Sequence, residues 1–126
     1  MRENYNVTIR ECSKELSARE RVLIKDTTNA ISLDEATDGS DSPLVISPDF
    51  YAVLDVHNEK SDNKDYTKYI LVDKNGNKFV TGSDSFWNSF MEIMAEMEGE
   101  GDFEIQVYRR ESNNYKGKSF ITCSIV

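Results

Sequence analysis

The sequence predicts a mainly β domain with one amphipathic helix. Short segments in which apolar and polar residues alternate recur along the chain, and this period of two is typical of half-buried strands. Two of these segments flank Asn75 and Gly76, a pair that suits a tight hairpin turn because both residues tolerate positive φ. One stretch, about residues 84–98, instead places its apolar side chains at helical spacing.

Length and composition limit the class of protein. The chain has 126 residues and a formal net charge of -8, which leaves room for one domain with its own core. Cys12 and Cys123 lie near opposite ends, and one histidine, His57, cannot complete a zinc site with them. No apolar run approaches the roughly 18 residues of a membrane span. We therefore expect a cytoplasmic protein that needs no membrane, metal or cofactor.

The first 33 residues are expected to form an extension of a domain that covers residues 34–126. Residues 5–9 alternate in polarity like a strand or an extended arm. Ser17 and Glu20 have the spacing of a capping box, which predicts a short helix or turn after Ser17. The pattern leaves open whether the extension packs across the domain, binds a ligand, or exchanges between the subunits of a homo-oligomer.

The middle of the chain predicts a loop and three strands. Residues 34–48 are rich in Asp, Ser and Thr and are expected to form a surface loop. Residues 50–56 predict a central strand with Ala52 and Leu54 on one face and Tyr51 and Val53 on the other. Residues 66–72 and 78–80 are expected to pair across the Asn-Gly turn.

The predicted helix and the segments after it complete the fold. Ser83 offers a cap before residues 84–98, and Gly99 offers a C-terminal stop. Residues 103–107 and 120–126 predict two further strands on either side of a basic turn. Five strands with a helix between the third and fourth is the order of an OB-fold, a small barrel whose open face and loops bind oligonucleotides.

The sequence gives no support for an enzyme, and no catalytic residue is assigned. His57 has no serine or cysteine motif near it, and a lone histidine is more often structural. The glycine patterns of phosphate-binding and dinucleotide-binding loops are absent. Glu92 and Glu96 lie one helical turn apart but lack an apolar pocket that would raise a pKa.

Charges are segregated along the chain. Residues 34–62 hold eight acids and one base, and residues 84–102 hold six acids and no base. Residues 64–80 and residues 103–126 each reverse this balance, with four bases and two acids. The net charge argues against a nucleic-acid partner, because phosphate binding uses Lys and Arg, but the basic last hairpin argues for one. A solvated surface is the plain alternative for each charge run.

Single-stranded nucleic acid suits the residues of the last hairpin. Unpaired bases stack on aromatic rings at about 1 to 3 kcal/mol per base while Lys and Arg follow the phosphates. Tyr108 is predicted to point away from the core-facing Ile105 and Val107. Trp87 is expected in the core or an interface. The candidate binding residues are Tyr51, Lys68, Tyr69, Lys78, Phe79, Tyr108, Arg109, Arg110, Tyr115, Lys116 and Lys118.

Several short segments resemble the single-stranded-DNA-binding proteins of bacteriophages and prophages of Gram-positive bacteria. They lie between residues 50 and 126, at residues 69–76, 82–83, 103–107 and 112–120. The resemblance implies an OB-type fold and sequence-independent binding of single-stranded DNA in phage replication or recombination, inside the bacterial host cell. It also implies replication or recombination proteins as partners, and it assigns the binding hairpin to Tyr108, Arg109, Tyr115, Lys116 and Lys118.

An acidic protein-binding module is the alternative from another class. Such a protein would use the carboxylates of residues 34–62 and 84–102 to imitate DNA or to bind a host protein. This explains the net charge more directly, but it does not explain the Tyr-rich basic hairpin. A purely structural or oligomerisation module is a third reading. Salt separates the three readings, because a single-stranded-DNA binder loses oligonucleotide affinity log-linearly with salt, whereas a DNA mimic should not bind oligonucleotides.

Overall fold

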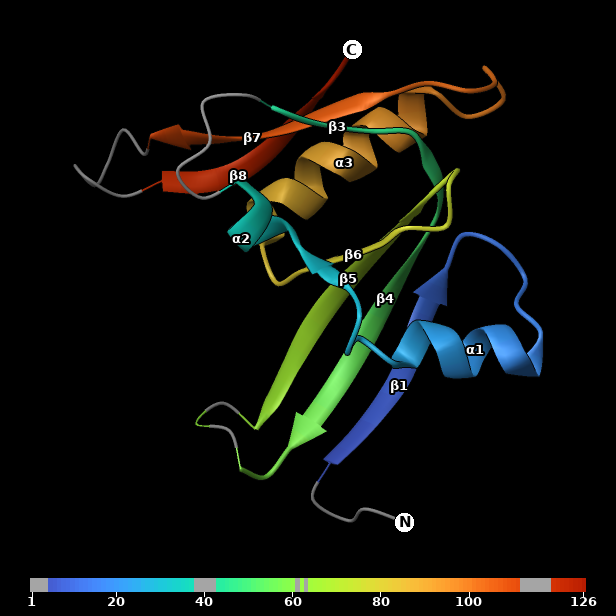
Figure 1. Ribbon diagram of the computed structural model, residues 1–126, viewed down its shortest axis with the longest axis vertical. Coiled ribbons are helices and arrows are strands. Elements are labelled where there is room, and N and C mark those ends of the chain that lie inside the picture. Colours follow the sequence, from blue (N-terminus) through green and yellow to red (C-terminus); the bar gives the residue numbers. More distant parts are fainter. Residues whose placement is uncertain (1–4, 38–42, 61, 63, 112–118) are drawn as a thin grey trace.

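The computed structural model describes residues 5–37, 43–60, 62, 64–111 and 119–126, and strands predominate among them (Figure 1). The mainly β class is therefore confirmed. The elements are β1 (Tyr5–Cys12), α1 (Ala18–Lys25), β2 (Ile31–Ser32), α2 (Leu33–Thr37), β3 (Leu44–Ile46), β4 (Pro48–Asn58), β5 (Asp65–Asp73), β6 (Lys78–Thr81), α3 (Asp84–Glu96), β7 (Ile105–Glu111) and β8 (Ser119–Ile125). None of the helices described is long and apolar enough to cross a membrane.

The strands form two open sheets. One sheet has the order β1-β4-β5-β6-β2 and the other the order β3-β7-β8, and among the described strands only the β2–β6 pair is parallel. The predicted five-stranded barrel is therefore not observed among the described residues, and an OB-fold is not confirmed. The prediction missed β3, because residues 34–48 read as a loop, whereas Leu44–Ile46 pairs with β7 and starts the second sheet.

A single residue, Ser47, joins β3 in one sheet to β4 in the other. Its carbonyl accepts a hydrogen bond from the Lys74 backbone N–H at 2.9 Å. Its hydroxyl donates to Glu104 Oε2 at 3.3 Å. The point where the chain changes sheets is thus tied both to the β5–β6 turn and to the segment before β7.

The N-terminal residues belong to the larger sheet. β1 pairs antiparallel with β4 from Tyr5 to Cys12, with a register shift between Ile9 and Glu11. The predicted capping box is present: the Glu20 N–H donates to Ser17 Oγ at 3.2 Å, and the Ser17 N–H donates to Glu20 Oε1 at 3.0 Å. α1 then covers one face of the sheet, where a second core cluster forms from Leu16, Ile24, Ala52, Leu54, Ile70 and Val72.

The main core lies between the two sheets and is built around α3. The prediction of a helix over residues 84–98 is confirmed within two residues, and Ser83 Oγ caps it by accepting from the Phe86 N–H at 3.2 Å. Phe86 and Phe90 are fully buried, with parallel rings 5.9 Å apart. They pack with residues of both sheets, including Val53, Leu71, Ile105, Val107 and Ile121.

The Asn-Gly turn between β5 and β6 is also present. Gly76 has a φ of 86°, a region that glycine adopts without strain. The buried Asp73 carboxylate accepts hydrogen bonds from the backbone N–H groups of Asn75 and Asn77, at 3.0 and 2.8 Å. The turn therefore depends on Asp73 as much as on the Asn-Gly pair.

Replacing Phe90 by Ala should lower the free energy of unfolding by about 3 to 5 kcal/mol, because the ring is fully buried between the sheets. Urea denaturation followed by circular dichroism measures this. Asn88→Ala, on the exposed side of the same helix, should change the value by less than about 0.5 kcal/mol. Equal stability of the two variants would contradict the central place of α3 in the core.

Candidate nucleic-acid interface

The outer face of the three-stranded sheet carries the aromatic and basic residues of the last hairpin. Ile105 and Val107 point into the core, so the residues that alternate with them along β7 point outward. Arg110 is directly opposite Phe120 on β8, and both are exposed. We define the outer face by its five members: Val45, Gln106, Tyr108, Arg110 and Phe120.

Tyr108 lies diagonally across the hairpin. Its backbone pairs with Thr122, but its hydroxyl shares a hydrogen bond of 2.7 Å with Ser124 Oγ, two residues further along β8. The ring is half-buried. The bond holds the ring against the sheet, so an incoming planar group would meet a surface that is already oriented.

The two arginines of the hairpin have different positions. Arg110 is exposed on the outer face, next to Phe120. Arg109 points to the other side, where its Nη2 donates to the carbonyl oxygen of Asp34 at 2.7 Å and ties α2 to β7. Arg109 is therefore a positioning residue rather than part of the outer face. Tyr115, Lys116 and Lys118 lie outside the described residues.

The three other predicted aromatic contacts are packed beneath α3. Tyr69 stacks on Trp87 with ring centroids 4.6 Å apart, and Tyr51 meets the same indole edge-on at 5.3 Å. Phe79 is 5% exposed and belongs to the core. Trp87, expected in the core or an interface, is buried. These rings already have protein partners, so they are not brought together with Tyr108.

The hydroxyl of Tyr69 is held by a carboxylate. It donates to Asp84 Oδ1 at 2.5 Å. Burial, together with this hydrogen bond, raises the pKa of Tyr69 to about 12. The phenol therefore stays protonated at physiological pH and acts as a structural donor at the start of α3.

Lys68 and Lys78 belong to the larger sheet and were predicted to contact phosphate. In the structure they contact the end of α1 and the residues after it. Lys78 Nζ donates to the carbonyl oxygen of Leu23 at 2.5 Å and also to that of Asp26. Lys68 Nζ donates to Thr27 Oγ1 at 3.3 Å. A cation at the C-terminal end of a helix is favourable because the carbonyl oxygens there carry partial negative charge. Lys68 and Lys78 are thus separated from the outer face.

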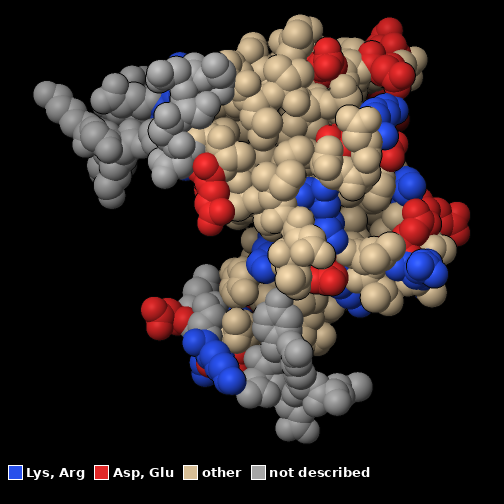
Figure 2. Space-filling view, viewed as in Figure 1, with Lys and Arg blue, Asp and Glu red and all other residues tan. Residues whose placement is uncertain are grey.

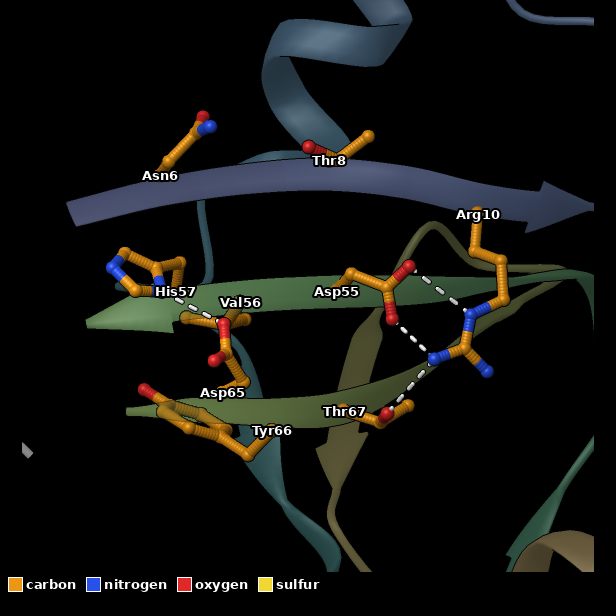
Figure 3. Close-up of a pocket in the computed structure, with 9 residues that line it drawn as sticks. All are labelled: Asn6, Thr8, Arg10, Asp55, Val56, His57, Asp65, Tyr66 and Thr67. Carbon is orange, nitrogen blue, oxygen red and sulfur yellow. Dashed lines mark hydrogen bonds and ion pairs between the residues drawn. The ribbon is translucent and has the colours of Figure 1, made fainter. Parts of the chain in front are cut away.

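A second polar surface lies on the larger sheet (Figure 3). It is a hollow of about 390 Å³ over β1, β4 and β5. Arg10 forms an ion pair with Asp55, with Nε donating to Oδ2 at 3.1 Å, and its Nη2 donates to Thr67 Oγ1 at 3.2 Å. Sequence reasoning missed this network, because its three residues are brought together only by the strand register.

His57 closes the other end of this hollow. Its Nδ1 lies 2.7 Å from Asp65 Oδ1, and its Nε2 lies 3.3 Å from Glu59 Oε1. These carboxylates, Asp65 first, raise the pKa of His57. Neither a serine nor a cysteine lies among the described residues that line the hollow. In the part of the chain that the structure describes, no group of three or more side chains is arranged to hold a metal ion.

Phe120 is the aromatic outer-face residue that sequence reasoning did not assign to the binding site. It was expected only as part of the closing strand. Its place opposite Arg110 follows from the register of β7 and β8, which is set by the length of the connection between them. An exposed aromatic residue at the start of a strand that follows a basic turn is the signal that could have identified it.

No protein family, curated protein or solved structure matches this chain. The fold and the candidate site are therefore defined by the structure of this chain alone. They define a mainly β protein in which two open sheets are held by one helix and an exposed strand pair carries aromatic and basic side chains.

The carboxylate partners of His57 should make stability depend on pH. Because the folded pKa of His57 is raised above its ordinary value of 6.5, this stabilisation is complete below pH 6.5 and is lost as the pH rises through the folded value. The difference in unfolding free energy between the native protein and His57→Gln should thus be larger at about pH 5.5 than at about pH 8.5.

His57 is the only histidine, so an NMR titration of its imidazole measures the pKa directly. Asp65→Asn should lower that pKa, because Asp65 is the first cause of the rise. Lys60→Gln, an exposed change in the neighbouring turn, serves as the control for general charge effects. A native pKa at or below the ordinary value would contradict the assignment of these contacts.

Proposed function

We propose that this protein binds single-stranded DNA without sequence preference, through the outer face of β7 and β8 and the basic segment that joins them. The observation that carries the proposal is the placement of Tyr108, Arg110 and Phe120 on one exposed face. The sequence continues from this face into residues 112–118, which contain Tyr115, Lys116 and Lys118.

The chemistry of the outer face favours a single strand over a duplex. An unpaired base exposes a π-face that can stack on the rings of Tyr108 or Phe120, whereas the bases of a duplex are already stacked on one another. The guanidinium of Arg110 is adjacent and can neutralise a phosphate. None of these contacts reads a base edge, so the proposed binding tolerates any sequence.

The charge distribution favours the last hairpin over the other basic stretch, residues 64–80, because the four lysines of that stretch already contact oxygen atoms of the protein. Residues 103–126 hold four bases and two acids, although the whole chain has a net charge of -8. In the polar hollow of the larger sheet, the positive charge of Arg10 is already paired with Asp55. A polyanion is therefore expected to be attracted more strongly to the last hairpin than to the acidic stretches of the chain.

The biological setting follows from the resemblance to phage and prophage single-stranded-DNA-binding proteins. We extend the proposal to a role in phage DNA replication or recombination in the cytoplasm of a bacterial host, with proteins of those processes as partners and a homo-oligomer as one form. The OB-type barrel that the resemblance implies is not needed for this proposal. The exposed strand pair supplies the proposed contacts without it.

Titration of a fluorescent oligo(dT) of about 30 nucleotides tests the proposal, at low and at moderate salt. We expect binding to the single strand and not to a duplex of equal length, with log affinity falling by about 0.7 per phosphate contact for each unit of log salt. No binding at low salt would overturn the proposal. That result is the one expected of a DNA mimic.

Substitutions of the aromatic outer-face residues should weaken binding of single-stranded DNA only when they remove the ring. Tyr108→Ala and Phe120→Ala should each reduce affinity by about 5- to 150-fold, the equivalent of about 1 to 3 kcal/mol for one stacked base. Tyr108→Phe should bind almost as the native protein does, because it keeps the ring and loses only the hydrogen bond to Ser124. The same oligo(dT) titration measures all three.

Arg110→Ala should reduce both the affinity and its dependence on salt, because one phosphate contact is lost. Lys60→Ala removes the same charge from an exposed turn in the other sheet and is the matched control. Equal effects of the two substitutions would mean that DNA responds only to overall charge, which contradicts a defined site.

A further inference from the structure

A groove with apolar walls runs along the C-terminal half of α3. It lies between this helix, the start of β4 and the segment that leads to β7, and it encloses a hollow of about 580 Å³. Its apolar lining includes Tyr51, Met91, Met94, Met97 and Phe103. These side chains are partly buried, so one side of each packs inward while the other side faces the groove.

A second hollow, of about 420 Å³, adjoins the first. The two share Met97, Phe103 and an ion pair in which Lys74 Nζ lies 3.0 Å from Asp102 Oδ1. The second hollow extends the apolar lining to Ile125, which is 45% exposed. Because they share this lining, the two hollows are contiguous, and together they form the groove.

The methionines give the groove an adaptable apolar surface. Methionine is unbranched and polarisable, so it can repack around partner side chains of different shapes. Met91, Met94 and Met97 follow one another at the three-residue spacing that brings side chains to one side of a helix. Apolar side chains of a partner could therefore be buried along this stripe.

The rim of the groove is acidic. Asp49, Glu98 and Asp102 line it against one base, Lys74, which pairs with Asp102, and residues 84–102 contain six acids and no base. The last turn of α3 also lacks a basic residue that would offset the negative end of the helix dipole. Figure 2 shows acidic side chains at the upper right, where Figure 1 places the segment that follows α3. An occupant should therefore carry positive charge.

We propose that this groove binds a basic amphipathic segment of a partner protein. The apolar side chains of the segment pack against the methionines and Phe103, and its Lys or Arg side chains face the acidic rim. The site goes beyond DNA binding and does not depend on it. β7 runs away from Phe103, so the groove and the tip of the β7–β8 hairpin are separated by about seven residues of strand, or about 20 Å.

Methyl NMR of the whole chain, labelled with ¹³C at the methionine methyl groups and free of DNA, tests the proposal. The chain has four methionines, of which Met91, Met94 and Met97 line the groove and Met1 serves as a reference. The probe is a synthetic amphipathic helix of Leu and Lys. A peptide of the same composition in shuffled order and a Leu/Glu helix are the controls.

We expect the Leu/Lys helix to shift the three groove methyls and leave Met1 unchanged, with weaker responses to both control peptides. Asp49→Lys with Glu98→Lys should weaken binding by about tenfold or more. Glu15→Lys with Asp62→Lys changes the net charge equally at exposed positions outside the groove and should have a much smaller effect. The methyl shifts of the native chain provide a result that does not depend on either variant.

Several outcomes would overturn this proposal. Equal responses to the Leu/Lys and Leu/Glu helices, or equal losses in the two double variants, would mean that no complementary site exists. Methyl shifts on dilution of the protein alone would assign the groove to a second copy of this chain. The two proposals fail separately. If the native chain does not bind oligo(dT) in a separate titration, the proposed function is refuted, but binding of the Leu/Lys helix to the groove still stands.

Discussion

The burial of one side of α3 between the two sheets is the constraint on which the rest of the structure depends. The Trp87 ring contacts the rings of Tyr51 and Tyr69, which belong to the larger sheet. On the other side, Ser85 Oγ donates to the carbonyl oxygen of Ile121 in β8 at 3.0 Å. The helix therefore fixes how the sheets face each other. It also packs against Tyr51 and Tyr69 of the larger sheet, so these two rings are not available beside Tyr108 on the outer face of β7 and β8.

Basic side chains of similar chemistry have different partners in the structure and therefore different roles. Arg10 is engaged by Asp55 and Thr67, and Lys78 is engaged by backbone carbonyl groups at the end of α1. A cation held in this way has part of its field cancelled and its side chain already ordered. Arg110 is exposed beside an aromatic ring. Position in the sheet, rather than residue type, separates structural cations from candidates for phosphate contact.

Local patterns predicted the local structure well. The capping box at Ser17, the turn at Gly76 and the buried side of α3 each depend on residues within a few positions of one another. The pairing of β3 with β7 joins residues about 60 positions apart, and alternation cannot reveal such a partner. For the same reason the sequence identified Arg110 but not Phe120 opposite it, and it did not predict that Lys68 and Lys78 contact the end of α1 and the residues after it.

The one-residue connection at Ser47 has a consequence for association kinetics. With β3 and β4 in different sheets, Ser47 hydrogen-bonded to both Lys74 and Glu104, and the main core packed between the sheets, opening of the sheets would break these contacts. Partners are therefore expected to meet a largely preformed arrangement of the two sheets. Encounter and electrostatic steering should therefore set the on-rate, and differences between ligands should appear mainly as differences in residence time.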